Sequence, residues 1–417
     1  MTNLLPLSDL VRVRIERLAD WLAVGVAVSL PWSTSATAVF IALWFVARVA
    51  VLNFGSIRRE LKSAAGGLPV LLWLLAALGT LWADVPWGER VAGLGGFDRL
   101  LCIPLLLAQF RRSERGNWVL YGLFASVLGV LLLSWGLVII PKLPWRAKMP
   151  GVPVKDYILQ STEFLICAFV LLGSVFDGRR MQKWQTLLCS TALAALFLAN
   201  IAFVVTGRTA LLVVPVLALL LGWRVSRWKG LLGAALTGCI IGLSVWLGSS
   251  YLRERLHDSM SELQTYRDSG AWSSTGLHLE FLKKSLRFVA TAPAIGHGTG
   301  SIAEQFRNAV VGETGAASYP SNNPHNQVFA VAIQLGLIGA SILLAMWISH
   351  FMLFRGSGLA AWIGTIVVVE SVVSSLVNSN LFDFSEGWLY VFGIGVAGGI
   401  VLRSRDLGMA EPSVRKL

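Results

Sequence analysis

Charged residues are scarce in this chain of 417 residues. Asp, Glu, Lys and Arg make up only 14% of it, whereas 55% of the residues are hydrophobic and the mean hydropathy is +0.67. Soluble domains carry about 25% charged residues. The composition therefore excludes an ordinary soluble protein and indicates an integral membrane protein.

Cysteine pairs and paired acids are also lacking. The four cysteines (Cys102, Cys167, Cys189 and Cys239) fall in apolar segments without CxxC spacing. This pattern favours buried small hydrophobic residues over disulfides or zinc ligands. The absence of a D-x-D pair disfavours a metal-dependent glycosyltransferase that uses nucleotide sugars. Because the histidines also lack metal-ligand spacing, we expect no metal and no other cofactor.

Apolar runs recur along the whole chain. A membrane-spanning helix needs about 20 predominantly apolar residues, and about twelve such runs, some of them short, lie between charged or Gly/Pro-rich breaks. They are Leu18–Pro31, Thr37–Leu52, Pro69–Leu81, Leu100–Phe110, Trp118–Ile140, Tyr157–Phe176, Thr186–Val205, Thr209–Trp223, Leu231–Leu247, Val328–Phe351, Leu359–Leu376 and Gly387–Leu402. No small-residue cleavage site follows the first run, so we expect it to stay as a span. The sequence predicts an all-α polytopic membrane protein with about twelve transmembrane helices.

Lysine and arginine gather in alternate short loops. Such clusters include Arg58, Arg59 and Lys62; Arg111, Arg112 and Arg115; Arg224, Arg227 and Lys229; and Arg403 and Arg405. The positive-inside rule predicts that these loops and both termini are cytoplasmic. The net charge of +12 is then explained by topology and by attraction to membrane lipids. We expect no nucleic-acid partner, since no basic face is interleaved with nucleic-acid motifs.

One long segment interrupts the short loops and is expected on the non-cytoplasmic side. Within it, "YLRERLHDSMSELQTY" and "TGLHLEFLKKSLRFVATAP" have helical apolar spacing, whereas "GHGTGS" and "GETGAASYPSNNPH" have the composition of turns. We therefore predict three parts. Residues 1–250 hold helices one to nine with short loops, 251–326 form a large helical loop subdomain, and 327–417 hold the last three helices and a cytoplasmic tail.

Three ionisable residues are candidates for function. Arg208 in "FVVTGRTALLV" lies between two apolar runs, where a charge usually faces a cavity or a partner. Its guanidinium suits phosphate, although a snorkelling interface arginine is an equal alternative. His325 can serve as an acid or base, or it can be a capping or packed residue. Glu370, in the middle of a span, is either functional or part of a structural pair.

Several motifs resemble the O-antigen ligase and polymerase superfamily. They are "PHNQVFAVAIQLGLIG" after a loop with "TAPAIGHGTGS", the upstream "ALGTLWADVPWGERVAGLGGFDRLLCIPLLLA", and the arginine-bearing turn "TGRTALL". Taken in the order of the chain, they cover most of it. The resemblance implies a glycosyltransferase of the GT-C kind in the bacterial inner membrane, with its active site facing the periplasm.

The resemblance also implies substrates and residue roles. The donor is a polysaccharide on undecaprenyl pyrophosphate and the acceptor is lipid A–core, with His325 as base and Arg208 at the pyrophosphate in a metal-independent, inverting transfer. A second family arginine precedes an R-x-x-[FW] pattern, where this chain has His278 and, upstream, Arg267. Four more basic residues on the outward side are expected to gather phosphorylated core sugars: Arg90, Arg99, Arg146 and Lys148.

Other functions remain open at this point. An O-antigen polymerase or a protein O-oligosaccharyltransferase uses the same donor, and we favour the ligase because the chain has one major loop and no appended C-terminal domain. A secondary transporter predicts two related halves, which we do not find. A non-catalytic assembly protein predicts that His325 and Arg208 are dispensable.

Overall fold

The computed structural model describes residues 9–140, 142–147, 149–176, 184–205, 207–248 and 250–408, and these form helices and loops. The helices are α1 (Asp9–Ser29), α2 (Thr34–Ala50), α3 (Phe54–Leu61), α4 (Ala64–Gly79), α5 (Trp87–Asp98), η1 (Arg99–Leu101), α6 (Cys102–Phe110), α7 (Gly116–Ile139), α8 (Tyr157–Val175), α9 (Trp184–Phe203), α10 (Arg208–Gly248), α11 (Ser250–Ser269), α12 (Ser274–Thr291), α13 (Ile302–Ala309), η2 (Gly315–Ser318), α14 (Gln327–Leu353), α15 (Leu359–Ser374) and α16 (Phe384–Asp406). The predicted all-α polytopic membrane fold is confirmed.

Fewer helices meet a strict test of length and hydropathy than the sequence predicts. In the described residues seven helices pass, or eight if the bent pair α2 and α3 is one span. Two more, α4 and α15, are apolar but shorter, and α1 carries several charged residues. The long α10 is bent back on itself at Ser226 and Arg227. Adding α1, α4, α15 and the second leg of α10 to the eight gives the predicted twelve.

The two legs of α10 lie very close together. A Cβ atom added to Gly222 would lie 2.4 Å from the carbonyl oxygen of Gly230. The sequence "GWRVSRWKG" therefore forms a tight turn between two helices, because only glycine allows this approach of the backbones. The turn carries the predicted basic cluster around Arg227.

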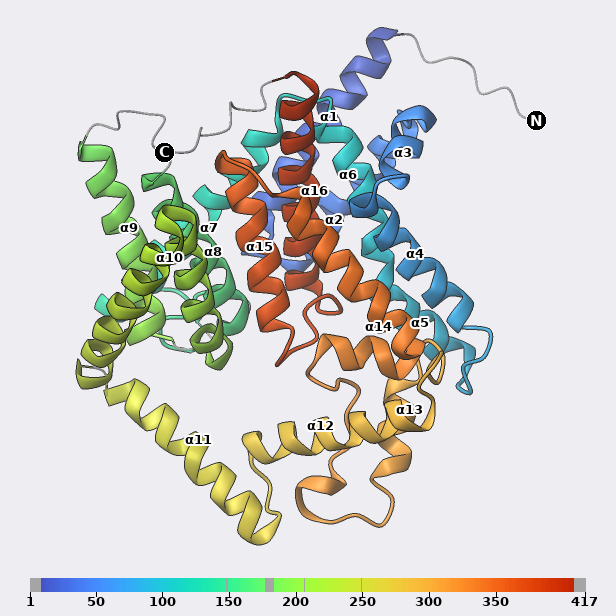
Figure 1. Ribbon diagram of the computed structural model, residues 1–417, viewed down its shortest axis with the longest axis vertical. Coiled ribbons are helices and arrows are strands. Elements are labelled where there is room, and N and C mark those ends of the chain that lie inside the picture. Colours follow the sequence, from blue (N-terminus) through green and yellow to red (C-terminus); the bar gives the residue numbers. More distant parts are fainter. Residues whose placement is uncertain are drawn as a thin grey trace.

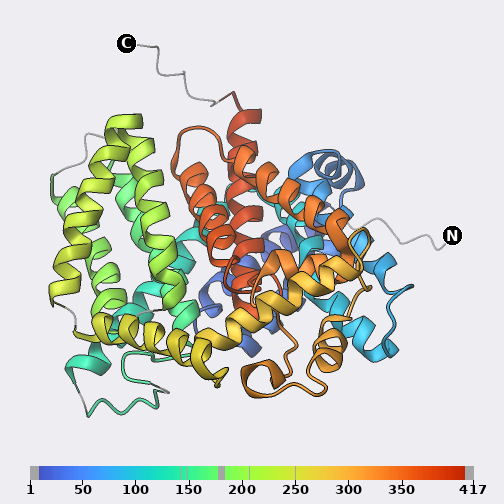
Figure 2. The same ribbon diagram turned by 60° about the horizontal axis from the view of Figure 1, so that its bottom comes forward.

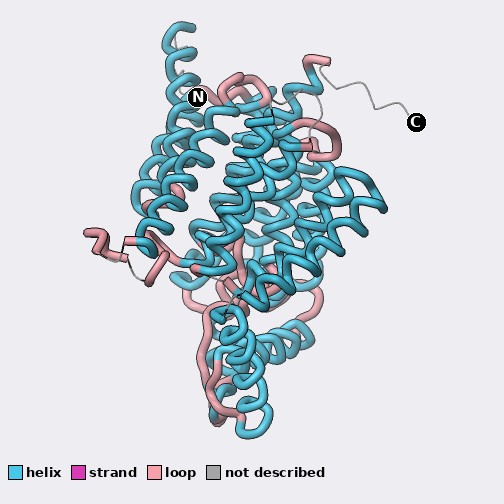
Figure 3. Tube along the Cα trace, turned by 90° about the vertical axis from the view of Figure 1, so that its left-hand side faces the viewer, coloured by secondary structure: helices cyan, strands magenta, loops and turns pink. Residues whose placement is uncertain are grey.

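The bundle has two distinct ends. The start of α1 and the end of α16 lie at one end, and α11, α12 and α13 form a cap at the other (Figure 1). Viewed from the cap, α11 and α12 run across the bundle rather than along it (Figure 2). The side view shows the cap and its loops projecting beyond the helical bundle (Figure 3). We call these the terminal end and the cap end.

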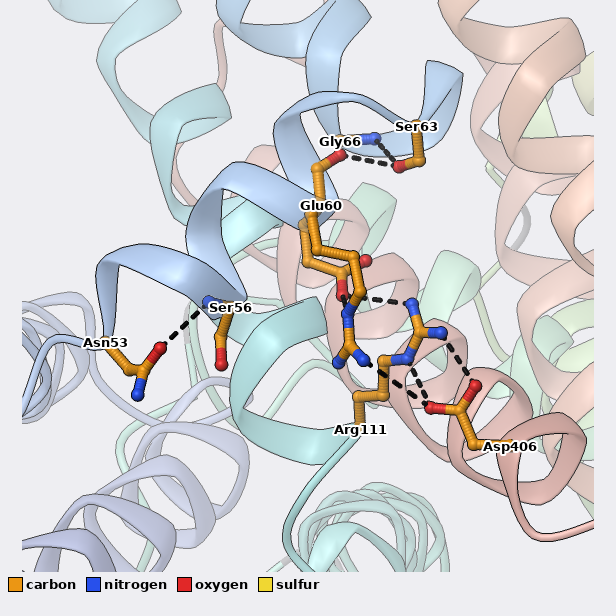
Figure 4. Close-up of polar contacts among 8 residues, drawn as sticks. Asn53, Ser56, Glu60, Ser63, Gly66, Arg111 and Asp406 are labelled. Atoms are coloured by element: carbon orange, nitrogen blue, oxygen red, sulfur yellow. Dashed lines mark hydrogen bonds and ion pairs between the residues drawn. The ribbon is translucent and has the colours of Figure 1, made fainter.

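Ion pairs join three helices at the terminal end. Arg111, after α6, donates from Nε and Nη2 to the two carboxylate oxygens of Asp406 in α16, each at 2.7 Å (Figure 4). Its Nη1 lies 3.1 Å from Oε1 of Glu60 in α3, whose side chain is fully buried. A bidentate guanidinium is suited to such a junction, because its fork matches a carboxylate. Glu60 also pairs with Arg59, at 3.3 Å.

At the cap end, α14 is broken rather than straight. Gly336 has a φ of +65°, and the peptide groups around it bond to the loop that follows α12 instead of to their own helix. The amide of Leu337 donates to the Pro293 carbonyl at 2.7 Å, and the amide of His297 donates to the Ile333 carbonyl at 2.8 Å. The predicted span Val328–Phe351 lies within α14, which passes the length and hydropathy test. Its helix is interrupted at Gly336, where the loop supplies the missing backbone partners.

The glycines of "GHGTG" explain how this loop fits. Gly296, Gly298 and Gly300 all have positive φ angles, between 68° and 90°. A Cβ added to Gly298 would lie 2.4 Å from the Cα of Ala83, before α5. The loop is thus pressed against the backbone of its neighbours, where side chains have no room.

The cap has an apolar core of its own. Phe306 of α13 is fully buried and meets Phe281 and Phe288 of α12 edge to face, at centroid distances of 5.6 and 5.2 Å. Ala330 and Ile333 from the first turns of α14 complete the cluster. Helix α13 had not been predicted from the sequence, which suggested only turns on either side of it. Its burial fixes α12 beside the start of α14.

Candidate functional site

His325 lies two residues before α14 in a constrained turn. Its backbone has a φ of +51°, which is uncommon for residues other than glycine. The Asn323 side-chain oxygen accepts the His325 amide at 2.9 Å and the Ser379 hydroxyl at 2.7 Å. Asn326 then caps α14 by accepting from the Phe329 amide at 3.1 Å. The Asn-rich sequence thus holds the backbone at His325 in one conformation, and such strain is often found at functional sites.

Two rings of α12 face the imidazole of His325. Phe281 stacks nearly parallel to it, with centroids 5.5 Å apart and an interplanar angle of 12°. His278, one turn earlier, meets it edge to face at 4.7 Å. Burial, and to a lesser extent the neighbouring His278, lowers the pKa of His325 to about 4. His325 is therefore neutral near pH 7 and keeps a lone pair on one ring nitrogen.

Both histidines lie on the wall of a cavity of about 950 Å³. The wall is built from α12, α13 and the segment between η2 and α14. Trp272 and Tyr319 also line it, with their rings edge to face at 5.1 Å. Their side chains are 56% and 38% exposed, so aromatic surface remains open to a bound molecule. A volume of this size accommodates a drug-sized ligand or a few sugar rings.

Arg307 of α13 is the arginine among the lining residues. Its Nη2 lies 2.9 Å from Oε1 of Glu89 in α5, and the guanidinium also pairs with Glu304. These acids hold a half-exposed cation at the cavity edge. Arg307 was not predicted from the sequence, because its position at the cavity depends on how α13 packs through the buried Phe306.

The comparison with protein families concerns this region. Residues 192–344 match the family model described as O-antigen ligase. This match covers less than half of the chain and supports a relationship to the O-antigen ligase superfamily. No curated protein matches the chain. The match runs from α9 into α14 and includes Arg208, Arg267, His278 and His325.

The family match supports a general class of activity. An O-antigen ligase is a glycosyltransferase-like enzyme with ligase- or polymerase-type activity in O-antigen processing. Its substrates are, in general terms, a lipid-linked polysaccharide and lipid A–core. The apolar helices indicate a multi-pass membrane protein.

Of the residues predicted to act, the cavity brings together His278 and His325. Arg208 begins α10, but its side chain lies outside the described residues, as does Lys148. Arg267 is exposed in the last turn of α11, and Arg146 is exposed in the loop between α7 and α8.

Arg90 and Arg99 bind backbone oxygens. Arg90 donates to the Val85 and Thr80 carbonyls at 2.7 and 2.8 Å and thereby closes the turn before α5. The buried Arg99 donates to the Asp383 and Phe382 carbonyls at the start of α16. Neither arginine lines the cavity.

Glu370 and a possible metal site were the remaining questions raised by the sequence. Glu370 of α15 is buried and accepts a hydrogen bond from the Thr162 hydroxyl of α8 at 3.1 Å, so a polar contact joins these helices. In the described part of the chain, no group of three or more His, Cys, Asp and Glu side chains is placed to hold a metal ion.

Proposed function

We propose that this protein is an O-antigen ligase. It transfers a polysaccharide from undecaprenyl pyrophosphate to a sugar hydroxyl of lipid A–core during lipopolysaccharide biosynthesis. The observation that carries the proposal is the neutral His325 on the wall of a cavity of about 950 Å³, within the segment that matches the family.

The transfer is a single displacement with inversion, of the GT-C kind. A sugar hydroxyl of the acceptor attacks the anomeric carbon of the donor, and the bond from that carbon to the pyrophosphate oxygen breaks with its electron pair. His325 takes the hydroxyl proton as general base. A pKa of about 4 makes His325 a weak base, but the negative charge of a bound pyrophosphate would raise that pKa.

The leaving pyrophosphate needs positive charge, and arginine can supply it without a metal. We assign this role to Arg208 at the start of α10, a position that the family match includes. Arg307 at the cavity edge is a second candidate, since an anionic substrate would compete with Glu89 and Glu304 for it.

The other predicted substrate-binding residues take lesser roles in the proposal. We retain His278 as a direct neighbour of His325. The exposed Arg267 and Arg146, together with Lys148, would gather phosphorylated substrates from outside the cavity. Arg90 and Arg99, which hold backbone turns, would add only to the local positive field.

The proposed topology follows the distribution of charge. The terminal end carries α3, the end of α6 and the end of α16, where predicted basic clusters are joined through Asp406. We place this end and both termini in the cytoplasm and the cap end in the periplasm. Residues 251–326 are then the periplasmic subdomain between two membrane parts, 1–250 and 327–417.

The test is transfer by the purified protein in detergent, with EDTA present. The donor is O-antigen on undecaprenyl pyrophosphate, and the acceptor is either lipid A–core or a second lipid-linked glycan. We expect transfer to lipid A–core, and loss of that transfer in Arg208→Ala. Growth of the lipid-linked glycan without transfer to lipid A–core would instead identify a polymerase.

A further inference from the structure

A second cavity, of about 620 Å³, lies at the terminal end. Its wall comes from α1, α2 and the turn between α6 and α7. Four arginines line it: Arg17, Arg48, Arg112 and Arg115. It therefore lies at the opposite end of the bundle from the cavity that holds His325 (Figure 1).

The acids in this wall are engaged by other groups. Asp20 accepts from the Gln109 amide and the Ser113 hydroxyl, each at 2.8 Å, and lies 3.5 Å from Arg115. The other two acids pair with arginines outside the wall, Glu16 with Arg12 and Glu114 with Arg403. Once these pairs are formed, the lining has an excess of positive charge.

Arg48 of α2 is the residue that points most directly to a ligand. It lines the cavity but is only 7% exposed. Its Nε is buried and has no hydrogen-bond partner among the described residues. A buried donor without an acceptor is costly, and a cation is more so. Glu16 and Asp20 lie near its charge, but an anionic oxygen in the cavity would supply the acceptor that its Nε lacks.

Aromatic side chains show what surrounds the cavity. Trp118 lines it and is 56% exposed, and its ring lies 6.3 Å from those of both Trp21 and Tyr121. Exposed tryptophan and tyrosine side chains gather at the level of lipid headgroups. The cavity is thus beside the membrane interface rather than in open solvent.

We propose that this cavity binds the phosphate of an anionic phospholipid headgroup. Basic pockets between transmembrane helices are suited to such headgroups, because several cations surround one phosphate in a place that acyl chains can reach. Arg48 supplies the buried contact, while Arg17 and Arg112 add charge from the wall. The site is separate from the proposed glycosyl transfer and does not depend on it.

The experiment measures lipid retention by the full-length protein. Native mass spectrometry in detergent follows binding of dioleoyl phosphatidylglycerol, with dioleoyl phosphatidylcholine as the neutral probe and inorganic phosphate as competitor. The variants are Arg48→Gln and the double variant Arg17→Gln/Arg112→Gln. The matched control is Arg14→Gln/Arg58→Gln, which removes the same charge from exposed positions outside the cavity.

We expect wild type and the control to retain phosphatidylglycerol in preference to phosphatidylcholine. Arg17→Gln/Arg112→Gln should weaken this binding about 25-fold, because each basic residue near an anionic headgroup contributes about fivefold. If the Arg48→Gln variant folds, it should weaken lipid binding at least as much. If it does not fold, the result of the double variant decides. Equal loss in the control, no preference for the anionic lipid, or displacement by millimolar inorganic phosphate would each overturn the proposal.

Discussion

The two ends of the bundle hold cavities that are built differently. At the terminal end the wall is lined with arginines, and Asp20 of α1 pairs with Arg115 within it. At the cap end the wall is imidazole and aromatic, and it is held by an asparagine turn and by backbone hydrogen bonds around glycines. The cavity at the terminal end suits a small anion such as a phosphate group. The cavity at the cap end presents a neutral base beside aromatic surfaces that can bind sugar rings.

Removal of the proposed base, His325, should have the largest effect. We expect His325→Ala to lower transfer to lipid A–core at least hundredfold, in the range typical of a lost general base, while donor binding is kept. His257→Ala is the control, because His257 is exposed on α11 and does not line the cavity. Equal activity of the two variants would remove His325 from the mechanism.

The ion pairs of the terminal end are expected to matter for stability rather than for transfer. Glu60→Ala leaves Arg111 without its buried partner and should lower the free energy of unfolding by about 3 kcal/mol. Glu114→Ala removes an acid that is 81% exposed and should cost less than about 0.5 kcal/mol. Thermal unfolding in detergent compares the two, and similar melting temperatures would contradict the structural role of Glu60.

The glycine loop can be tested by adding a single methyl group. Gly298→Ala places a Cβ against the Ala83 backbone at a φ of +88°, so we expect a loss of about 2 kcal/mol in stability. Gly88→Ala, on α5, meets no atom within 4 Å and should leave stability unchanged or slightly higher. Thermal unfolding should therefore show a lower melting temperature for Gly298→Ala than for Gly88→Ala.

Substitutions at His278 test how the cap-end cavity positions its substrate. The family resemblance expects an arginine at this position, and the structure has an imidazole beside His325. We expect His278→Ala to reduce kcat/KM about tenfold, by losing a positioning contact of about 1.4 kcal/mol, and His278→Arg to restore part of it. An inactive His278→Arg together with an unaffected His278→Ala would show that this position does not serve the substrate.

Local sequence patterns were sufficient for the straight helices. The predicted span Tyr157–Phe176 is α8, which begins where the Asp156 side chain accepts the amides of Ile158 and Leu159. His325 could also be found, because a titratable residue in a polar turn beside an apolar run is conspicuous in the sequence.

What the sequence did not reveal depends on contacts between distant segments. The break at Gly336 requires carbonyl groups from Pro293 and Ala294, and "IQLGLIG" by itself reads as an unbroken helix. Arg99 reaches a carbonyl 284 residues away, so its structural use has no local signal. Helix α13 did leave a trace, since Ile302 and Phe306 are four residues apart on one face, but eight residues are too few for periodicity to be decisive.

The pH dependence of kcat/KM tests most directly whether neutral His325 is the base. A pKa of about 4 means that His325 loses its proton as the pH rises through about 4 and stays active above it. The account predicts that kcat/KM is constant from pH 6 to 8 and falls towards pH 4 as one group becomes protonated. Unfolding is monitored at each pH. The residual activity of His325→Ala should not show this fall. A limb near 6.5, or activity that falls as the pH rises from 6 to 8, would contradict it.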